Sequence, residues 1–159
     1  MEFEVNNLEE IVELIMKKMS ESSISTSSNS KNGVFENVDE AIAEAKKAQA
    51  ILFSSKLELR ERIIASIRDT LKPYITELSE LAVKETGMGR VSDKEIKNRI
   101  AIEKTPGLED LKAFAFSGDD GLTVMELSPY GVIGAITPST NPSETVICNS
   151  IGMIAAGNA

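Results

Sequence analysis

The chain has 159 residues, of which 42% are hydrophobic and 26% charged, an ordinary composition for a single globular domain. Its net charge of −8 disfavours nucleic acid and membrane surfaces as partners. No apolar run approaches the roughly 20 residues that are needed to span a bilayer. One cysteine, Cys148, and no histidine exclude an intramolecular disulfide and every mechanism with a histidine base, and we expect no metal site.

Residues 1–19 have the pattern of a short amphipathic helix. Its apolar residues recur at helical spacing and fall on one face: Val5, Leu8, Ile11, Val12, Ile15, Met16 and Met19. The start of the chain is acidic and lacks the basic region of a secretory signal. An isolated helix of about 15 residues is only marginally stable in water, so this one needs a partner for its apolar face.

Residues 20–32 have the composition of a flexible linker. Seven of these 13 residues are serine, and serine-rich segments behave as tethers. The preceding helix could fold back onto its own domain, but the length and polarity of the linker favour an external partner.

Residues 33–159 are predicted to form the folded body of the protein. Helical patterns cover residues 38–52, 56–72, a stretch after Pro73 to Thr86, 93–104 and 108–116. Ser55 and Ser92 are predicted N-caps, because serine side chains accept hydrogen bonds from the first free amides of a helix. Gly87 suits the position just after a helix end.

The pattern then changes from helices to strands. Residues 117–121 read Ser-Gly-Asp-Asp-Gly and predict a turn, and the alternation in 122–127 predicts a strand. The apolar run 132–136 predicts a strand buried on both faces, as in a parallel sheet.

A final helix is predicted over residues 142–156. Asn141 suits the N-cap, Pro142 the first helical position, and Gly157 the residue that stops the helix. A buried strand followed by a helix is the first half of a βαβ unit, so a parallel strand should begin after Gly157. We therefore expect this chain to be a piece of a longer α/β protein.

The loop at 137–142 lies where α/β sheets bind ligands, outside the carboxyl end of a strand and at a helix N-terminus. The glycine-rich dinucleotide fingerprint is absent from it. A ligand-binding loop and a plain connector are equally supported by this pattern alone.

The residues around this loop resemble the aldehyde dehydrogenase superfamily. Residues 128–142 and the end of the chain at 156–159 match the pattern of this superfamily. The pattern is P-x-G-V, an apolar strand, a proline loop with an asparagine, a helix and A-x-G-N. Glu85-Thr86-Gly87 also resembles a superfamily motif. The versions T-P-S-T-N-P at 137–142 and G-M-G-R at 87–90 resemble the CoA-acylating branch, which oxidises acetaldehyde, propionaldehyde or butyraldehyde to acyl-CoA.

This resemblance implies an α/β fold. N-terminal helices would precede the opening strands and first helix of a Rossmann-like cofactor domain. Residues 33–159 would contain only part of that domain. The full-length parent would add a catalytic domain and an oligomerising arm, and we expect a homo-oligomer. The family binds NAD, with CoA as co-substrate. The resemblance places Ile136, Thr137, Pro138 and Ser139 at the nicotinamide ribose.

An asparagine of this loop helps to form the oxyanion in the family. Hydrolytic members have P-W-N-F-P, whereas Pro138 to Pro142 reads P-S-T-N-P. If the prolines align, Thr140 takes the place of that asparagine and Asn141 follows one residue later. Asn141 and Thr140 are therefore the candidates for oxyanion support, and Asn141 is equally suited to be only a helix cap.

The family's nucleophile is a cysteine, and Cys148 is not predicted to be that residue. It lies among apolar residues in the middle of the predicted helix 142–156 and has no neighbouring base. Buried structural cysteines are inert. The resemblance places the nucleophile beyond residue 159, so we expect this chain alone to be inactive.

Residues 1–32 resemble the encapsulation peptides of bacterial microcompartment cargo. These are amphipathic helices that a flexible linker joins to an enzyme and that dock on shell proteins. The expected location is then the cytoplasm, inside a microcompartment, with a shell protein bound through residues 5–19. The alternative is a non-catalytic adaptor that binds shells, while an enzyme that releases a free acid is disfavoured by Thr140-Asn141.

Overall fold

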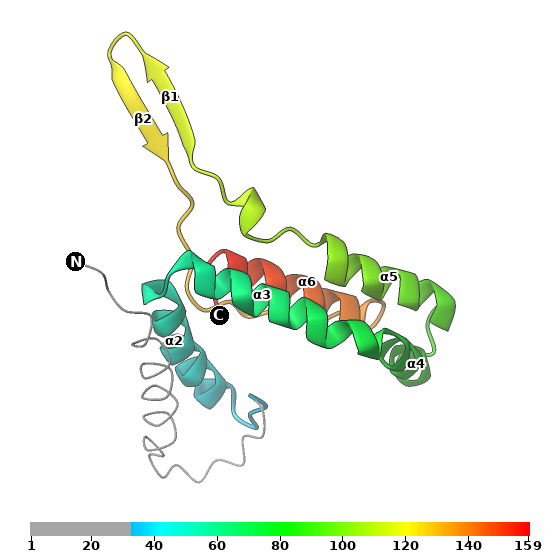
Figure 1. Ribbon diagram of the computed structural model, residues 1–159. Helices are drawn as coiled ribbons and strands as arrows, with labels where there is room; N and C mark the ends of the chain where they lie inside the picture. The colour runs from blue at the N-terminus through cyan, green and yellow to red at the C-terminus, as the bar shows by residue number, and fades with distance from the viewer. Residues whose placement is uncertain (1–32) are drawn as a thin grey trace, which may run out of the picture. The chain divides into compact units, whose positions relative to one another are not determined.

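The computed structural model describes residues 33–159 (Figure 1). The amphipathic helix predicted at 1–19 and the linker at 20–32 lie outside the described residues. Residues 39–159 form a compact unit separate from residues 1–38, and the description below concerns that unit. None of the described helices is both long and apolar enough to cross a membrane.

Five helices dominate this unit, and each matches a predicted one to within a few residues. They are α2 (Val38–Ser54), α3 (Leu57–Leu71), α4 (Ile75–Thr86), α5 (Val91–Lys104) and α6 (Pro142–Ala155). Single 3₁₀ turns at Lys72–Tyr74 and Leu108–Asp110 follow α3 and α5. Pro73 lies in the first of these turns, where the helical run between α3 and α4 is interrupted.

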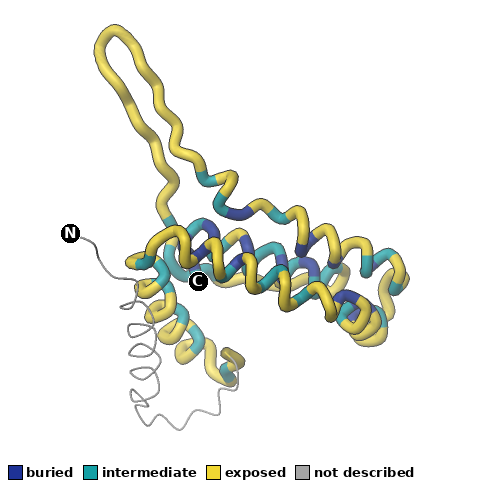
Figure 2. Tube along the Cα trace, viewed as in Figure 1, coloured by how far each residue is buried: buried dark blue, intermediate teal, exposed yellow. Residues whose placement is uncertain are grey.

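The core lies where α6 packs against α3, α4 and α5. Figure 2 shows the buried positions facing one another along these helices. The buried apolar residues are mostly isoleucine and alanine: Ile64, Ile75, Ala101, Ile102, Ile147, Ile151 and Ala155. Ile102 on α5 and Ile151 on α6 are completely buried. The central position of α6 fixes the place of its N-terminus, where the candidate site begins.

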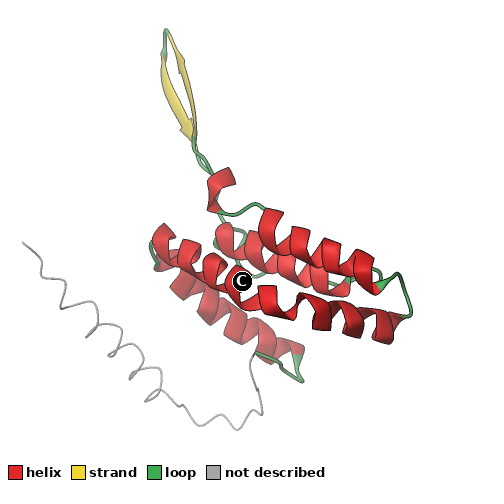
Figure 3. Ribbon diagram, turned by 45° about the vertical axis from the view of Figure 1, so that its right-hand side comes forward, coloured by secondary structure: helices red, strands yellow, loops and turns green. Residues whose placement is uncertain are grey.

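A hairpin interrupts the helices between α5 and α6 (Figure 3). Strands β1 (Phe114–Gly118) and β2 (Gly121–Met125) pair antiparallel, with Asp119 and Asp120 as the turn. The turn predicted within 117–121 is confirmed at its centre, and the strand predicted at 122–127 is confirmed with its end two residues earlier, at Met125. Every residue of both strands is exposed.

The helix predicted at 108–116 is wrong. Its first residues form only the 3₁₀ turn Leu108–Asp110, and its last ones belong to β1. Phe114 pairs with Met125 and Phe116 with Thr123. Cross-strand pairing with β2 favours the extended backbone for these aromatic residues over their local helical spacing.

The strand predicted at 132–136 is not formed as a regular strand. In place of burial on both faces, Ile136 is 95% exposed. The start of the segment does pair with the end of the chain: Ala159 N donates to Gly131 O at 3.0 Å, and Ile133 N donates to Ala159 O at 2.7 Å. These two bonds have the alternation of a parallel bridge, which is the pairing expected of a βαβ unit. Among the described residues no other strand pairs with this segment, and its apolar side chains pass from half-buried at Val132 and Ile133 to exposed at Ala135 and Ile136.

Helix ends were predicted less well than helices. Gly87, with φ of +66°, ends α4 as expected, and its amide donates to Val83 O. Ser55 does not cap α3, because its hydroxyl donates back to Ile51 O at 2.7 Å and Lys56 precedes the helix. Ser92 lies inside α5 and not at its cap, since the helix already begins at Val91.

Candidate functional site

The loop at 137–141 joins the segment that pairs with Ala159 to the N-terminus of α6. Asn141 is the residue before the helix and Pro142 is its first residue, as predicted. The loop is therefore anchored at one end by the buried helix α6 and at the other by the parallel bridge. Its side chains lie at a helix N-terminus, where free backbone amides and the helix dipole favour negative charge.

Two lysines of α5 hold this loop. Lys94, only 3% exposed, donates from Nζ to the Thr140 carbonyl oxygen at 2.9 Å. Lys97, one turn along the same helix, donates from Nζ to Asn141 Oδ1 at 3.2 Å. One contact fixes the backbone and the other a side chain, so α5 sets the conformation of the loop at two successive residues.

Asn141 is at the N-cap position, but its side chain does not cap the helix. No hydrogen bond joins this side chain to the first amides of α6. Its oxygen accepts from Lys97, and its amide nitrogen has no hydrogen-bond partner among the described residues. The capping function predicted for Asn141 is therefore wrong, and its NH₂ group is left free to donate.

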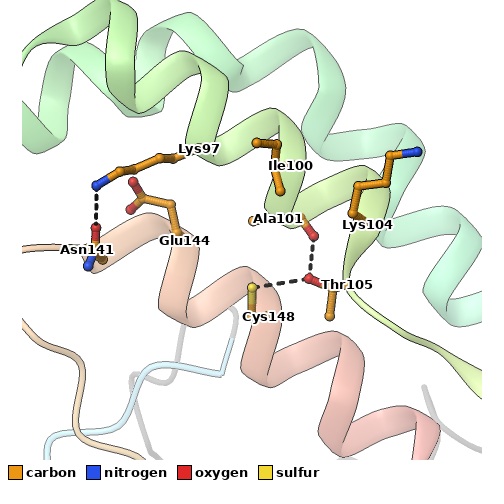
Figure 4. Close-up of a pocket in the computed structure, with 8 residues that line it drawn as sticks. All are labelled: Lys97, Ile100, Ala101, Lys104, Thr105, Asn141, Glu144 and Cys148. Carbon is orange, nitrogen blue, oxygen red and sulfur yellow. Dashed lines mark hydrogen bonds between the residues drawn. The ribbon is translucent and has the colours of Figure 1, made fainter. Parts of the chain in front are cut away.

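A pocket of about 300 Å³ lies between α5 and α6 beside this side chain (Figure 4). Its wall is mostly apolar surface with a few polar groups, the usual character of a small-molecule site. The lining residues are Lys97, Ile100, Ala101, Lys104, Thr105, Asn141, Glu144 and Cys148. Asn141, Glu144 and Cys148 share this wall because they are spaced three and four residues apart, on one face of α6.

Glu144 places a carboxylate in this pocket. The residue is 8% exposed, and Ser143 Oγ lies 3.2 Å from its Oε2. The other oxygen, Oε1, is buried without a partner among the described residues. A buried acceptor without a donor is costly and calls for an explanation. A ligand that donates a hydrogen bond in the pocket would satisfy it.

Cys148 lies in the middle of α6, as predicted. It is half-buried, packs against the core and has its Sγ atom 3.1 Å from Thr105 Oγ1. No histidine exists in the chain to activate it. These contacts are those of a packed structural cysteine.

A larger groove of about 770 Å³ runs along the other side of α6, between α3, α4 and α6. The predicted cofactor residue Thr137 lies on its wall with Pro142 and Ser143. The loop thus lies between the groove, which Thr137 lines, and the pocket, which Asn141 lines. Ile136, Pro138 and Ser139 are exposed and line neither hollow.

Lys94, Lys97 and Glu144 are site residues that the sequence patterns do not indicate. The two lysines lie in a charged helical stretch whose pattern indicates an ordinary solvated face, and Glu144 is the one charged residue of an otherwise uncharged helix. The spacing of three residues between Asn141 and Glu144 puts both side chains on one wall of the pocket. No local signal marks the two lysines, because they act on a loop more than 40 residues away.

Comparison with known proteins decides the family. The sequence model of the aldehyde dehydrogenase family matches residues 10–159. The chain belongs to the aldehyde dehydrogenase family. Its similarity to the acetylating acetaldehyde dehydrogenase EutE of Salmonella typhimurium is 46% identity over 153 residues, which cover 96% of this chain and 32% of that protein.

Solved structures of family members agree with the fold. The propionaldehyde dehydrogenase of Rhodopseudomonas palustris with bound propionyl-CoA aligns at a TM-score of 0.77 and 53% identity, over 81% of this chain and 29% of that one. A propionaldehyde dehydrogenase from the fucose utilisation microcompartment of Clostridium phytofermentans aligns at 0.77 and 50%, over 81% and 30%. The predicted fold class, N-terminal helices and the opening of a Rossmann-like domain of this family, is confirmed. The chain spans about a third of the length of the relatives it matches.

Proposed function

We propose that this chain is the N-terminal part of an NAD-dependent, CoA-acylating aldehyde dehydrogenase that converts a short aldehyde, CoA and NAD to acyl-CoA and NADH. The proposal rests on the sequence identity of this chain to two CoA-acylating relatives, which is 46% and 53%. A pocket beside the loop that this family uses supports it. Both relatives are named for a short aldehyde, acetaldehyde or propionaldehyde. A pocket of about 300 Å³ suits a substrate of that size.

In this proposal the aldehyde lies in the pocket between α5 and α6. The apolar wall at Ile100 and Ala101 receives its alkyl chain. The NH₂ group of Asn141 supports the oxyanion that forms when a thiolate attacks the carbonyl, because it is a donor at the pocket wall that has no partner among the described residues. Thr140 supports the same step indirectly, because the bond that Lys94 donates to its carbonyl oxygen holds the backbone next to Asn141.

The cofactor would lie on the other side of the loop. Thr137 and Ser139 carry hydroxyls that can bond the hydroxyls of a ribose, and the loop is exposed beside the N-terminus of α6. The residues present therefore fit the nicotinamide ribose, with Ile136 and Pro138 as apolar neighbours. NAD supplies the hydride acceptor when bound, and the chain's own loop orients it toward the pocket.

The 159-residue chain alone should not turn over aldehydes. Its one thiol, Cys148, is packed in α6 beside Thr105 and has no histidine base. Purified chain incubated with propanal, CoA and NAD should give no NADH above a boiled control. Turnover that disappears in Cys148→Ser would contradict this and make Cys148 the nucleophile.

The full activity is tested on the complete reading frame that encodes this chain. We expect NADH and a thioester in equal amounts from acetaldehyde or propanal, and formation of both should require CoA. Asn141→Ala should lower kcat by roughly 10²-fold or more, as removal of one oxyanion donor does in other enzymes. NADH formation with release of free acid in the absence of CoA would overturn the acylating assignment.

We also propose that residues 5–19 dock on a microcompartment shell protein and bring the enzyme into the lumen. The match to EutE extends over 153 of 159 residues, so it reaches into the first 32 residues. A relative of 50% identity comes from a microcompartment. A fluorescent protein fused to residues 1–32 should co-purify with intact shells, and Ile11→Asp with Ile15→Asp should abolish this. Glu9→Lys, on the polar face, is the matched control. A shell-binding protein whose complete frame has no dehydrogenase activity would favour the adaptor.

We propose, finally, that the full-length protein is a homo-oligomer. The hairpin supports this, because its apolar side chains, among them Phe116, Leu122 and Val124, are exposed. A two-stranded hairpin is marginally stable alone and its open edges invite pairing. Sedimentation of the complete protein should show an oligomer that Phe116→Asp with Val124→Asp weakens.

A further inference from the structure

We propose that Lys97 is a positioning residue that fixes the orientation of the Asn141 carboxamide. The effect is that the NH₂ group of Asn141, and not its oxygen, is presented to a bound ligand. This inference deepens the proposed function and rests on it, because the group being oriented is the proposed oxyanion donor. It assigns to α5 a function in the reaction that its sequence pattern does not indicate.

The chemistry of the contact determines the orientation. Lys97 Nζ lies 3.2 Å from Asn141 Oδ1. An ammonium group has three donors and no acceptor, so it can pair only with the oxygen of a carboxamide. The oxygen and nitrogen of the carboxamide lie on opposite sides of its carbon. Figure 4 shows the oxygen turned toward Lys97 and the nitrogen turned away.

No competing contact explains the orientation. A side chain at an N-cap ordinarily turns its oxygen to the first helix amides, which would point the NH₂ group elsewhere. Asn141 makes no such bond to α6. Among the described residues, its bond to Lys97 is the one hydrogen bond of this side chain. Without Lys97 the carboxamide would be free to turn toward the helix amides.

Lys94 makes the effect of Lys97 specific. Its bond of 2.9 Å to Thr140 O holds the backbone that precedes Asn141. With the backbone held by one lysine, a change of the other alters the side chain while leaving the loop in place. Lys97 and Lys94 therefore have separable effects, and Lys97 is the residue to test.

The first test uses the chain as it is. The side-chain NH₂ resonances of Asn141 are identified in a ¹⁵N spectrum by their loss in Asn141→Ala. Lys97→Met should shift these resonances, while Lys97→Arg, which keeps a donor-only group, should shift them less. Arg99→Met is the matched control, because Arg99 is an exposed cation of the same helix that makes no hydrogen bond or ion pair with another described residue. Unchanged resonances in Lys97→Met would overturn the proposal whether or not the enzyme is active.

The second test is kinetic and uses the complete reading frame. Lys97→Met should lower kcat by about tenfold with little change in the KM for the aldehyde, since the loss falls on the transition state. Lys97→Arg should restore most of the rate, and Arg99→Met should match the unmodified enzyme. In an Asn141→Ala background, Lys97→Met should have no further effect, because the group that it orients is gone.

The outcomes separate this inference from the proposed function. Absence of CoA-dependent turnover in the unmodified protein would overturn the proposed function, and the spectra would still decide the orientation. Loss of rate in Asn141→Ala without loss in Lys97→Met would overturn the inference alone. Additive losses in the double variant would also overturn it, because Lys97 would then act independently of Asn141.

Discussion

The guanidinium of Arg60 lies 2.9 Å from the place where a Cβ atom of residue 157 would stand, so Arg60 occupies its position only because residue 157 is glycine. Arg60 is buried on α3 and donates to Ala155 O at 3.3 Å, at the end of α6. A cation at a helix C-terminus is favoured by the helix dipole. This contact ties the start of one core helix to the end of another and to the turn that leads to the parallel bridge.

Gly157→Ala should therefore destabilise the chain. The substitution places a side chain at φ of +79° and against the buried guanidinium, and we expect a loss of about 2 kcal/mol in the free energy of unfolding. Urea denaturation of the purified chain measures it. Gly152→Ala is the matched control, since that glycine lies inside α6 with open space around it. The control should gain up to about 1 kcal/mol, and a loss in both variants would show that neither α6 nor the turn after it tolerates an added methyl group.

Arg68→Met should destabilise the contact between α3 and the end of α5. Arg68 donates to Ile102 O and to Thr105 O, both at 2.7 Å, and these carbonyls lie in the last turn of α5 and just after it. Removal of two part-buried hydrogen bonds from a charged donor should lower the free energy of unfolding by about 2 kcal/mol. A lower midpoint of urea denaturation measures this loss. Arg62→Met, an exposed arginine of the same helix, should change the stability by less than about 0.5 kcal/mol. Equal effects of the two substitutions would refute the importance of the carbonyl contacts.

Glu144→Leu should stabilise the chain, in contrast to most substitutions at buried sites. The substitution removes a buried carboxylate oxygen that has no donor among the described residues and puts apolar volume in its place. We expect a gain of about 1 kcal/mol in the free energy of unfolding. Ile147→Ala, at a buried apolar position of the same helix, should lose about 3 kcal/mol. A loss of stability in Glu144→Leu would mean that Oε1 is already satisfied and that no ligand is needed to explain it.

Glu109 should make the free energy of unfolding of the chain depend on pH in the acidic range. Hydrogen bonds from backbone amides, first that of Glu109 itself and then that of Gly107, lower the pKa of Glu109 below its usual value, with a smaller contribution from Arg68. A carboxyl whose pKa is lower in the folded state contributes stability above its unfolded pKa, and this contribution is lost as the pH falls through the folded pKa. Glu109→Gln should therefore be less stable than the unmodified chain near pH 7, and the difference should disappear as the pH falls through the folded pKa of Glu109. Glu103→Gln, an exposed carboxylate of α5, is the control, and a gap that persists in acid would contradict this account.

The helices of the core could be predicted from the sequence because their determinants are local. The spacing of Ile147, Ile151 and Ala155 identifies the buried face of α6, and Pro142 and Gly157 mark its ends within the same segment. The family motif at 128–142 is also contiguous, so the loop could be located before its conformation was known. The helix predicted through Phe114 and Phe116 failed because the residues that pair with them lie in β2, beyond a turn.

The sequence by itself determined which stretches are helical, where the loop lies and which family the chain resembles, since propensity, periodicity and motifs depend on neighbouring residues. Tertiary structure alone decided how the loop is held. The bonds from Lys94 to Thr140 and from Lys97 to Asn141 join residues more than 40 positions apart, and they exist only because core packing brings α5 beside the start of α6. Packing likewise buries Glu144 Oε1 without a donor, since the burial of a side-chain atom depends on the elements around it and not on its neighbours in the chain.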